Sequence, residues 1–480
     1  MTGPTRTILG AAFVFATLLP AARSEAFCGF FVAGSNEKLT NNASQVAILR
    51  EGNRTSLTMS NTYKGPPENF AMVVPVPVVL KKEAVKTLPL DVFEHLDALS
   101  APRLVEYWER DPCAPDPPMP PMMSPAPSGA AQVTVHRRMG GDHGVKIEAQ
   151  FVVGEYDILI LSAQESGGLE TWLREHKYRI PDGAAAALAP YVRSQMKFFV
   201  AKVDVTKVHR SASGVLQLSP LRVSYESNEV RLPVRLGLLN AEKKQDLIVY
   251  LLHPSSRFET SNYPNLFIPT NLDVVDAVRK NFASFYAELF DAVLAPVQGK
   301  AVVTEYAWQT DSCDPCPTPP LQPQDIVTLG GKTDNAAGYH GSYNGYGYSP
   351  WVLTRLHARY DRSSLSDDLL FREAPPAYGG RANYDGTSND AGAVVGGGSN
   401  NFQGRYIIRH YWDGKVACSD PRYNRWGGPP GSSPYGYQAP AAPAQGLAVV
   451  ERGKVSLKSS VRSPIPSLGL PGMAPPRHHQ

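Results

Sequence analysis

Two cysteines three positions apart, inside a run of prolines, have the most distinctive chemistry in this sequence. The segment SCDPCPTPP spans Ser312 to Pro320 and contains Cys313 and Cys316. Such a pair can serve as a thiol redox centre, as half of a zinc site or as a disulfide cross-link. A reactive thiol needs the N-terminus of a helix, where the helix dipole lowers the pKa of the thiol. The prolines after Cys316 disfavour such a helix, because each residue before a proline is pushed out of the α region.

The remaining cysteines do not complete a metal site in the sequence. Zinc would require a second ligand pair at a comparable spacing. Cys28, Cys113 and Cys418 are isolated, and the pattern His-x-x-x-His does not occur. We therefore predict a structural disulfide between Cys313 and Cys316, no metal and no cofactor, and we keep a thiol-disulfide oxidoreductase as the alternative. Internal pairing of five cysteines leaves one over, and the sequence does not define the partners of the other three.

The sequence contains no motif of a nucleophilic hydrolase, and its candidate acid-base residues have a simpler interpretation. The sequence contains no Gly-x-Ser-x-Gly, and the similar string GGGSNN follows no strand that could form a nucleophile elbow. Several histidines are scattered without a shared motif, namely His136, His143, His209, His253 and His410. Two of the acids Glu106, Glu109 and Asp111 could act as a catalytic pair, but we expect all three on the solvated side of a helix. A hydrolase with a site assembled from distant residues stays open as a second alternative.

The clearest binding feature is the aromatic segment GYHGSYNGYGYSPW, from Gly338 to Trp351. Its candidate contact residues are Tyr339, Tyr343, Tyr346, Tyr348 and Trp351. Aromatic rings on a glycine-rich loop supply contact area at a low cost in side-chain entropy, which suits recognition of a protein or a glycan. The same glycines are also typical of a mobile low-complexity loop.

The charge distribution argues against a nucleic-acid-binding protein. The formal net charge is +3, and residues 427–480 hold five Lys and Arg against one Glu, so the rest of the chain is nearly neutral. Affinity for phosphate needs clustered Lys and Arg, which this nearly neutral body does not supply. We expect no nucleic-acid partner.

The N-terminus has the features of an export signal. Arg6 precedes an apolar run from Ile8 to Leu19, and Ser24-Glu25-Ala26 offers small residues for cleavage after Ala26. The run is too short to span a bilayer, which needs about 20 apolar residues. We expect an exported periplasmic or extracellular protein with no transmembrane segment after cleavage. Its cysteines would then meet an oxidising environment.

The elements that must position these residues follow two patterns. Alternation of apolar and polar residues predicts strands, as in Phe199 to Val205, Leu221 to Tyr225 and Val230 to Leu238, and a polar face of period two is typical of antiparallel sheets. Apolar residues recur at helical spacing in two stretches, Val92, Phe93, Leu96 and Leu99, then Leu104, Val105, Tyr107 and Trp108. The predicted fold is α+β, mainly antiparallel, with helices packed on one face of the sheet.

Composition divides the chain into five parts. Two stretches rich in proline break all periodicity, one in the first third of the chain and one at the end. The predicted parts are a signal peptide (1–26), an N-terminal α+β part (27–112), a Pro-rich linker or excursion (113–131), a main α+β part with Gly/Tyr-rich loops (132–426) and a disordered, basic, Pro-rich tail (427–480).

Six stretches together resemble an exported bacterial family, domain of unknown function 2330. They are FCGFFVAG, NTYKGPPENFAMVVPVPVVL, PRLVEYWERDPC, CDPCPTPPL, WVLTRLHARYD and RYIIRHYW. The resemblance extends from about Phe27 to Cys418. It implies a bacterial envelope location and supplies no activity, substrate or catalytic residue.

The export signal, the cysteine pattern and the missing catalytic motifs lead to one functional hypothesis. We expect a non-catalytic binding or structural protein of the bacterial envelope that recognises a protein or a surface polymer. The alternative is an envelope enzyme, either an oxidoreductase that uses Cys313 and Cys316 or a hydrolase with a non-contiguous site.

Overall fold

The fold is described from a computed structural model of the chain. The described residues are 30–32, 43–60, 62–63, 71–115, 144–176, 178, 180, 183–210, 216–239, 244–314, 316–332, 351–380, 392–396, 398–431 and 450–473. The predicted signal peptide and most of the predicted Pro-rich linker lie outside them. Within this part of the chain, no helix is both long and apolar enough to cross a membrane.

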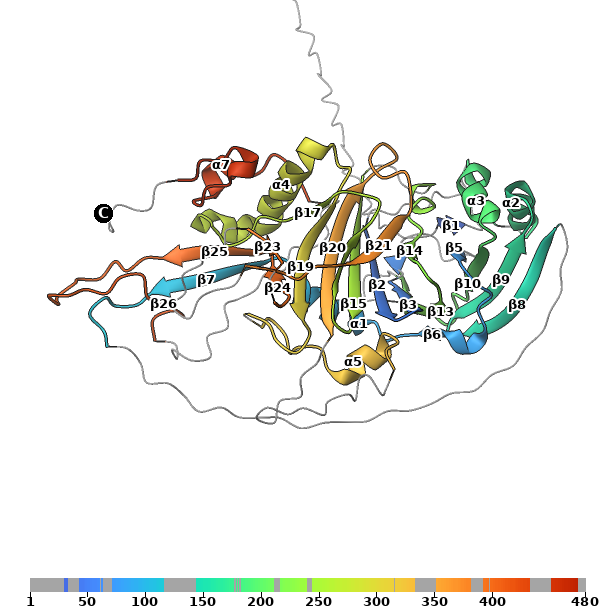
Figure 1. Ribbon diagram of the computed structural model, residues 1–480, viewed down its shortest axis with the longest axis horizontal. Coiled ribbons are helices and arrows are strands. Elements are labelled where there is room, and N and C mark those ends of the chain that lie inside the picture. The colour runs from blue at the N-terminus through green and yellow to red at the C-terminus, as the bar shows by residue number, and fades with distance from the viewer. Residues whose placement is uncertain are drawn as a thin grey trace, which may run out of the picture.

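The largest sheet has eleven strands and occupies the middle of the molecule (Figure 1). In spatial order it contains β23 (Val394–Val395), β22 (Ala377–Gly379), β24 (Asn401–Gln403), β19 (Val302–Gln309), β20 (Val352–Tyr360), β15 (Gln245–His253), β2 (Ala43–Glu51), β3 (Arg54–Met59), β13 (Leu221–Glu226) and β6 (Val85–Thr87), with β17 (Asn265–Phe267) beside β19. Most pairs are antiparallel, but β15 with β2, β17 with β19 and β22 with β24 are parallel. Strands from the predicted parts 27–112 and 132–426 therefore share one sheet.

A second, five-stranded sheet packs against one face of the central sheet. Its order is β1 (Phe30–Val32), β5 (Ala71–Val76), β10 (Lys197–Val203), β9 (Tyr156–Ala163) and β8 (Val145–Val153). Alternate residues of both sheets meet in one apolar core, for example Val74 and Ile160 with Val249 and Leu251. This is the burial that period-two alternation produces when two sheets face each other.

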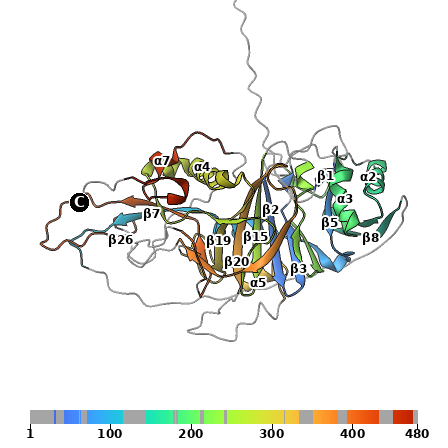
Figure 2. The same ribbon diagram turned by 45° about the horizontal axis from the view of Figure 1, so that its top comes forward.

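Helices cover the outer face of each of these two sheets. The five-stranded sheet carries α2 (Ser166–Glu175) and α3 (Ala184–Arg193) on its outer side. The central sheet carries α1 (Asp91–Ser100), α4 (Phe282–Leu294) and α5 (Pro323–Thr328) on its own outer side. Two sheets that share a core leave two outer apolar faces, and each needs cover. Figures 1 and 2 show α2 and α3 at one end of the molecule.

At the other end lies a four-stranded sheet made of β18 (Leu272–Asp273), β25 (Arg405–His410), β7 (Arg103–Glu109) and β26 (Trp426–Gly427). The helix predicted around 104–108 is wrong, because this stretch is β7. It pairs in parallel with β25, about three hundred residues later in the chain. A disulfide between Cys113 and Cys418 joins the segments that follow the two strands.

Smaller elements complete the fold. One three-stranded sheet contains β14 (Val230–Leu232), β21 (Leu369–Ala374) and β16 (Arg257–Thr260), and another contains β11 (His209–Arg210), β12 (Leu216–Gln217) and β4 (Thr62–Tyr63). The 3-10 helices are η1 (Lys82–Ala84), η2 (Gly237–Leu239), η3 (Asp276–Asn281), η4 (Ala295–Val297) and η6 (Pro466–Leu468).

Part of the C-terminal tail packs on the rest of the fold. Residues 450–473 include α7 (Leu457–Ser460) and pack beside α4, where Val461 and Ile465 are buried. Arg452 also donates a hydrogen bond to Asp291 of α4, at 2.8 Å. A few apolar residues of 450–473 thus have a partner surface that the tail composition does not reveal. Residues 432–449 and 474–480 lie outside the described part.

Candidate functional site

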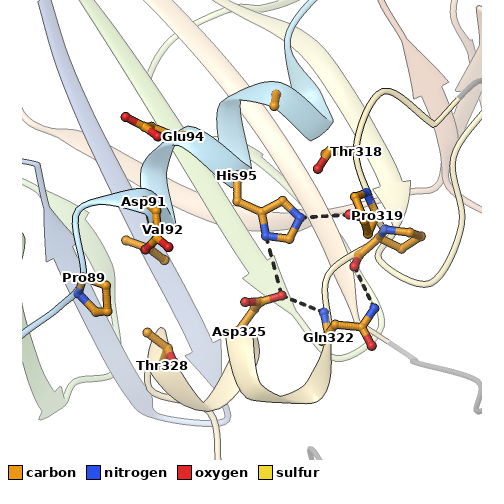
Figure 3. A pocket seen from close by; sticks show the side chains of 12 residues that line it. Pro89, Asp91, Val92, Glu94, His95, Thr318, Pro319, Gln322, Asp325 and Thr328 are labelled. Carbon is orange, nitrogen blue, oxygen red and sulfur yellow. Dashed lines mark hydrogen bonds and ion pairs between the residues drawn. The ribbon is translucent and has the colours of Figure 1, made fainter. Parts of the chain in front are cut away.

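The candidate site is a groove of about 570 Å³ between α1 and the segment that leads into α5 (Figure 3). It is lined by Pro89, Asp91, Val92, Glu94, His95, Ala98, Thr318, Pro319, Pro320, Gln322, Asp325 and Thr328. The volume lies within the range of small-molecule and peptide sites.

One wall of the groove is the polar face of α1. The apolar residues Phe93, Leu96 and Leu99 pack on the central sheet. Helical periodicity then leaves the side chains of Asp91, Glu94, His95 and Ala98 on the side away from that core. The amphipathic pattern of this helix therefore both attaches it to the sheet and presents two carboxylates to the groove.

The opposite wall begins at the cysteine pair. A disulfide joins Cys313 and Cys316, and the prolines of 317–320 follow it. Helix α5 starts only at Pro323, where Gln322 and Asp325 form a reciprocal capping box. Because the pair lies in the connection after β19 and not at the start of a helix, no helix dipole acts on either sulfur atom.

His95 connects the two walls. Its Nε2 donates a hydrogen bond to the carbonyl oxygen of Pro319 at 2.8 Å, and its Nδ1 lies 3.6 Å from Oδ2 of Asp325 (Figure 3). The carbonyl can only accept, so Nε2 carries the proton. Asp325 in turn accepts the main-chain N–H of Gln322 at 2.7 Å. These contacts hold the proline segment at a defined distance from α1.

The charge of the groove is negative. Its lining includes the carboxylates of Asp91, Glu94 and Asp325, and the described lining residues include no lysine or arginine. Asp91 and Glu94 are exposed to solvent. Such a surface attracts cations and disfavours anions. In the described part of the chain, no group of three or more His, Cys, Asp or Glu side chains is arranged to hold a metal ion.

A buried ionic network fixes α1 on the sheet from below. Arg355 of β20 bonds through Nη1 to Oδ1 of Asp97 on α1 and through Nε to Oε2 of Glu305 on β19, each at 2.6 Å. Oε1 of Glu305 lies 2.7 Å from Nδ1 of His357, whose Nε2 lies 3.4 Å from Oδ1 of Asp246. Charges of alternating sign thus form a chain beneath the groove helix.

The pKa values in this network favour the charged forms. Burial by itself raises the pKa of Glu305, but the charges of His357 and Arg355 and the hydrogen bonds outweigh it and lower the pKa to about 2. Burial by itself lowers the pKa of His357, but Glu305 and Asp246 outweigh it and raise the pKa to about 9. The imidazolium of His357 and the carboxylate of Glu305 are therefore ionised at neutral pH.

Comparison with known proteins gives the chain a family. Residues 21–372 match the model of the DUF2330 family, described as an uncharacterized protein conserved in bacteria. The chain belongs to the DUF2330 family. A search of the curated proteins found no match, and neither did a search of the solved structures. The groove lies wholly inside the part that matches DUF2330, whereas β22 to β26 and α7 lie beyond it.

The aromatic segment predicted as a contact loop is only partly visible in this DUF2330 chain. Tyr339, Tyr343, Tyr346 and Tyr348 lie outside the described residues. Trp351 is 1% exposed and belongs to the core beneath α1 and α5. Trp351 is therefore unavailable as a surface contact, because it precedes β20 directly and its side chain points into the protein.

The acids of β7 are buried, which corrects the expectation of a solvated helical face. Glu106 accepts hydrogen bonds from Arg279 at 2.7 Å and lies 2.8 Å from Nε2 of His410. Glu109 accepts the main-chain N–H groups of residues 412 and 424, at 3.0 and 2.7 Å. Asp111 accepts the N–H of Cys113 at 2.8 Å. Glu106 and Glu109 each hold distant chain segments together, whereas Asp111 bonds within its own turn.

Among the described residues, His253 does not form a nucleophilic triad with its neighbouring serines. Nδ1 of His253 accepts the main-chain N–H groups of Ser255 and Ser256, and the hydroxyl of Ser256 donates to Glu373 at 2.6 Å. A nucleophilic serine would donate to the histidine. His136 and His143 lie outside the described residues.

Several residues of the site were missed by sequence reasoning. His95, Asp97, Glu305, Arg355 and His357 were not candidates. The available signal was the alternation in WVLTRLHARYD, which places Arg355 and His357 on the same side of a strand. A polar strand face normally indicates that this face is exposed to solvent. Here the face is covered by α1 and α4, and its polar side chains form buried ion pairs.

Proposed function

We propose that this chain is a non-catalytic binding protein of the bacterial envelope that holds a cationic, extended segment of a partner protein in the groove between α1 and α5. The observation that carries the proposal is the composition of the groove. It combines three carboxylates with proline-rich walls, and its described lining contains one histidine, His95 beside Asp325, and no lysine or arginine to neutralise Asp91 and Glu94. Lysine or arginine side chains would meet the carboxylates, and aliphatic parts would lie on the prolines.

No helix begins at Cys313 or Cys316, so no helix dipole is available there to activate a thiol. This favours a binding protein over a thiol-disulfide oxidoreductase. Cys313 also packs against the core under α1 and α5, which favours a role in shaping the groove wall. Export to an oxidising compartment, as expected from the N-terminus, is consistent with a disulfide that stays closed.

A titration with a short lysine- and proline-rich peptide tests the proposal. The full exported chain with its disulfides intact is expected to bind this peptide and not the same peptide with glutamate in place of lysine. Binding should weaken as salt is added, because the groove carboxylates are exposed. The double variant Asp91→Asn with Glu94→Gln should lower the affinity about fivefold or more.

The matched control is Glu175→Gln, which removes an exposed acid from helix α2 on the other sheet. It should leave the affinity unchanged. Equal binding of the lysine and glutamate peptides, or equal losses in the groove variant and the control, would overturn the proposal. Hydrolysis of a broad panel of hydrolase substrates, or reduction of insulin by the chain, would favour the enzyme alternative.

A further inference from the structure

A second pocket of about 250 Å³ lies where α3 meets β14 and β21. Its lining consists of Pro190, Tyr191, Ser194, Arg231, Arg235, Asn262, Asp367, Asp368 and Leu370. None of these residues lines the groove between α1 and α5. The pocket is small and carries four charged side chains, two of each sign.

The guanidinium groups have hydrogen-bonding capacity that their protein partners leave unused. Arg231 donates hydrogen bonds through Nε and Nη2 to Glu229, at 3.0 and 2.8 Å. Its Nη1 lies 3.6 Å from Oδ2 of Asp368, which is beyond hydrogen-bond range. Arg235 donates through Nη2 to Asp367. Its Nε is buried and has no hydrogen-bond partner among the described residues. That N–H is closed to a ligand as well as to water, so the capacity open to a ligand lies in the outer nitrogens of the two partly exposed guanidinium groups, of which Nη1 of Arg231 has no acceptor within hydrogen-bond range among the described residues.

The two carboxylates differ in how firmly the protein holds them. Asp368 is 6% exposed and accepts the hydroxyl of Tyr191 at 2.5 Å. Burial raises its pKa, against the hydrogen bonds from Tyr191 and the main chain of Arg235. Asp367 has a side chain that is 65% exposed and uses one oxygen for Arg235. Its second oxygen can accept from a ligand.

We infer that this pocket binds a small zwitterion of the α-amino acid class, with its carboxylate on the guanidinium groups of Arg231 and Arg235 and its ammonium on the carboxylate of Asp367. The summed charge of the pocket is zero, so a ligand with a net charge of either sign gains little from it. A ligand with separated charges of both signs is complemented at each end. The volume is below that of a drug-sized site and suits a molecule of this size.

Isothermal titration of the full chain, disulfides intact, tests this inference independently of the groove. The probes are glycine, L-alanine, L-glutamate and L-lysine, with acetate and methylammonium at equal ionic strength as ligands that carry one charge only. At least one amino acid is expected to bind below about 10 mM, and neither single-charge ligand should bind as tightly. Arg235→Gln should weaken amino acid binding about tenfold or more.

The matched control is Arg372→Gln. Arg372 lies on β21, the strand that carries the pocket residue Leu370, and pairs with Glu259 of β16 outside the pocket. This variant should leave the affinity unchanged. If Arg235→Gln fails to fold, Asp367→Asn at the exposed carboxylate serves instead and should weaken amino acids but not acetate. The inference is overturned if no amino acid binds, if acetate binds as tightly as the amino acids, or if the pocket variants bind like the control.

Discussion

At the scale of single residues, the least exposed charges of the described chain are structural rather than reactive. Glu305 is fully buried and accepts from Tyr286 at 2.5 Å in addition to Arg355 and His357. Every one of these partners is itself buried. Because no substrate can reach these buried groups, their role is structural. Removal of one partner from such a buried ion pair strongly destabilises the fold.

The imidazolium of His357 should make the stability of the fold depend on pH. Its pKa is about 9 in the folded chain, against about 6.5 when unfolded. Its stabilisation is therefore fully present below pH 6.5 and is lost as the pH rises through 9. His357→Gln is expected to lower the free energy of unfolding by about 3 kcal/mol near pH 6, and the difference should shrink toward pH 10.

Urea denaturation of both proteins at a series of pH values measures this difference. Arg372→Gln, which removes one side of an exposed ion pair, is the control and should change stability by no more than about 0.5 kcal/mol at every pH. A difference between wild type and His357→Gln that stays constant from pH 6 to pH 10 would contradict the assignment of the charge to His357.

At the scale of elements, the position of α1 depends on one ion pair as well as on apolar packing. Asp97 faces the sheet, where Arg355 and the hydroxyl of Tyr250 bond to it at 2.6 and 3.0 Å. Phe93 of the same helix packs near the ring of Tyr250. The groove wall is thus attached through side chains that lie behind it, out of contact with a groove ligand.

Asp97→Asn should loosen α1 without altering the groove surface. The neutral amide weakens the bond to Arg355, and local opening of the helix becomes easier. We expect the α1 amides to exchange their hydrogens about tenfold faster, which corresponds to roughly 1.4 kcal/mol. Mass spectrometry of hydrogen exchange measures this, with Glu94→Gln on the exposed side of the same helix as the control. Equal exchange in the two variants would show that the ion pair does not hold the helix.

At the scale of the whole molecule, the chain beyond residue 372 completes the structure of the family-matched part. Strand β25 pairs with β7, and Val461 and Ile465 cover α4. The disulfide between Cys113 and Cys418 closes a loop with a sequence separation of 305, whereas Cys313 and Cys316 are separated by 3. The two cross-links therefore act on very different lengths of unfolded chain.

Their removal should have unequal effects on stability. Loop-closure entropy predicts a loss of about 6 kcal/mol for the double variant Cys113→Ser with Cys418→Ser, and about 2 kcal/mol for Cys313→Ser with Cys316→Ser. Chemical denaturation of both variants beside the wild type measures the losses. A larger loss for the short loop would mean that the proline segment after Cys316 contributes more to the fold than the pairing of β7 with β25.

The sequence by itself determined the features that depend on neighbouring residues. Alternation predicted strands such as β13, helical spacing predicted α1, and the prolines after Cys316 disfavoured a helix at the cysteine pair. Six short stretches sufficed for the family. Each of these signals is local, because the periodicity of apolar residues and the backbone preferences of residues such as proline involve only residues a few positions apart.

Only the tertiary structure decided where the polar residues go. Helical spacing at 104–108 was overridden by a partner strand three hundred residues away, which buried Glu106 and Glu109. Arg355 and His357 lie on a polar strand face that the packing of α1 and α4 turned into an interior. The groove likewise exists only because α1 and the segment after Cys316 lie side by side. Pairing and burial of this kind are set by long-range contacts, and a local pattern contains no information about its partner.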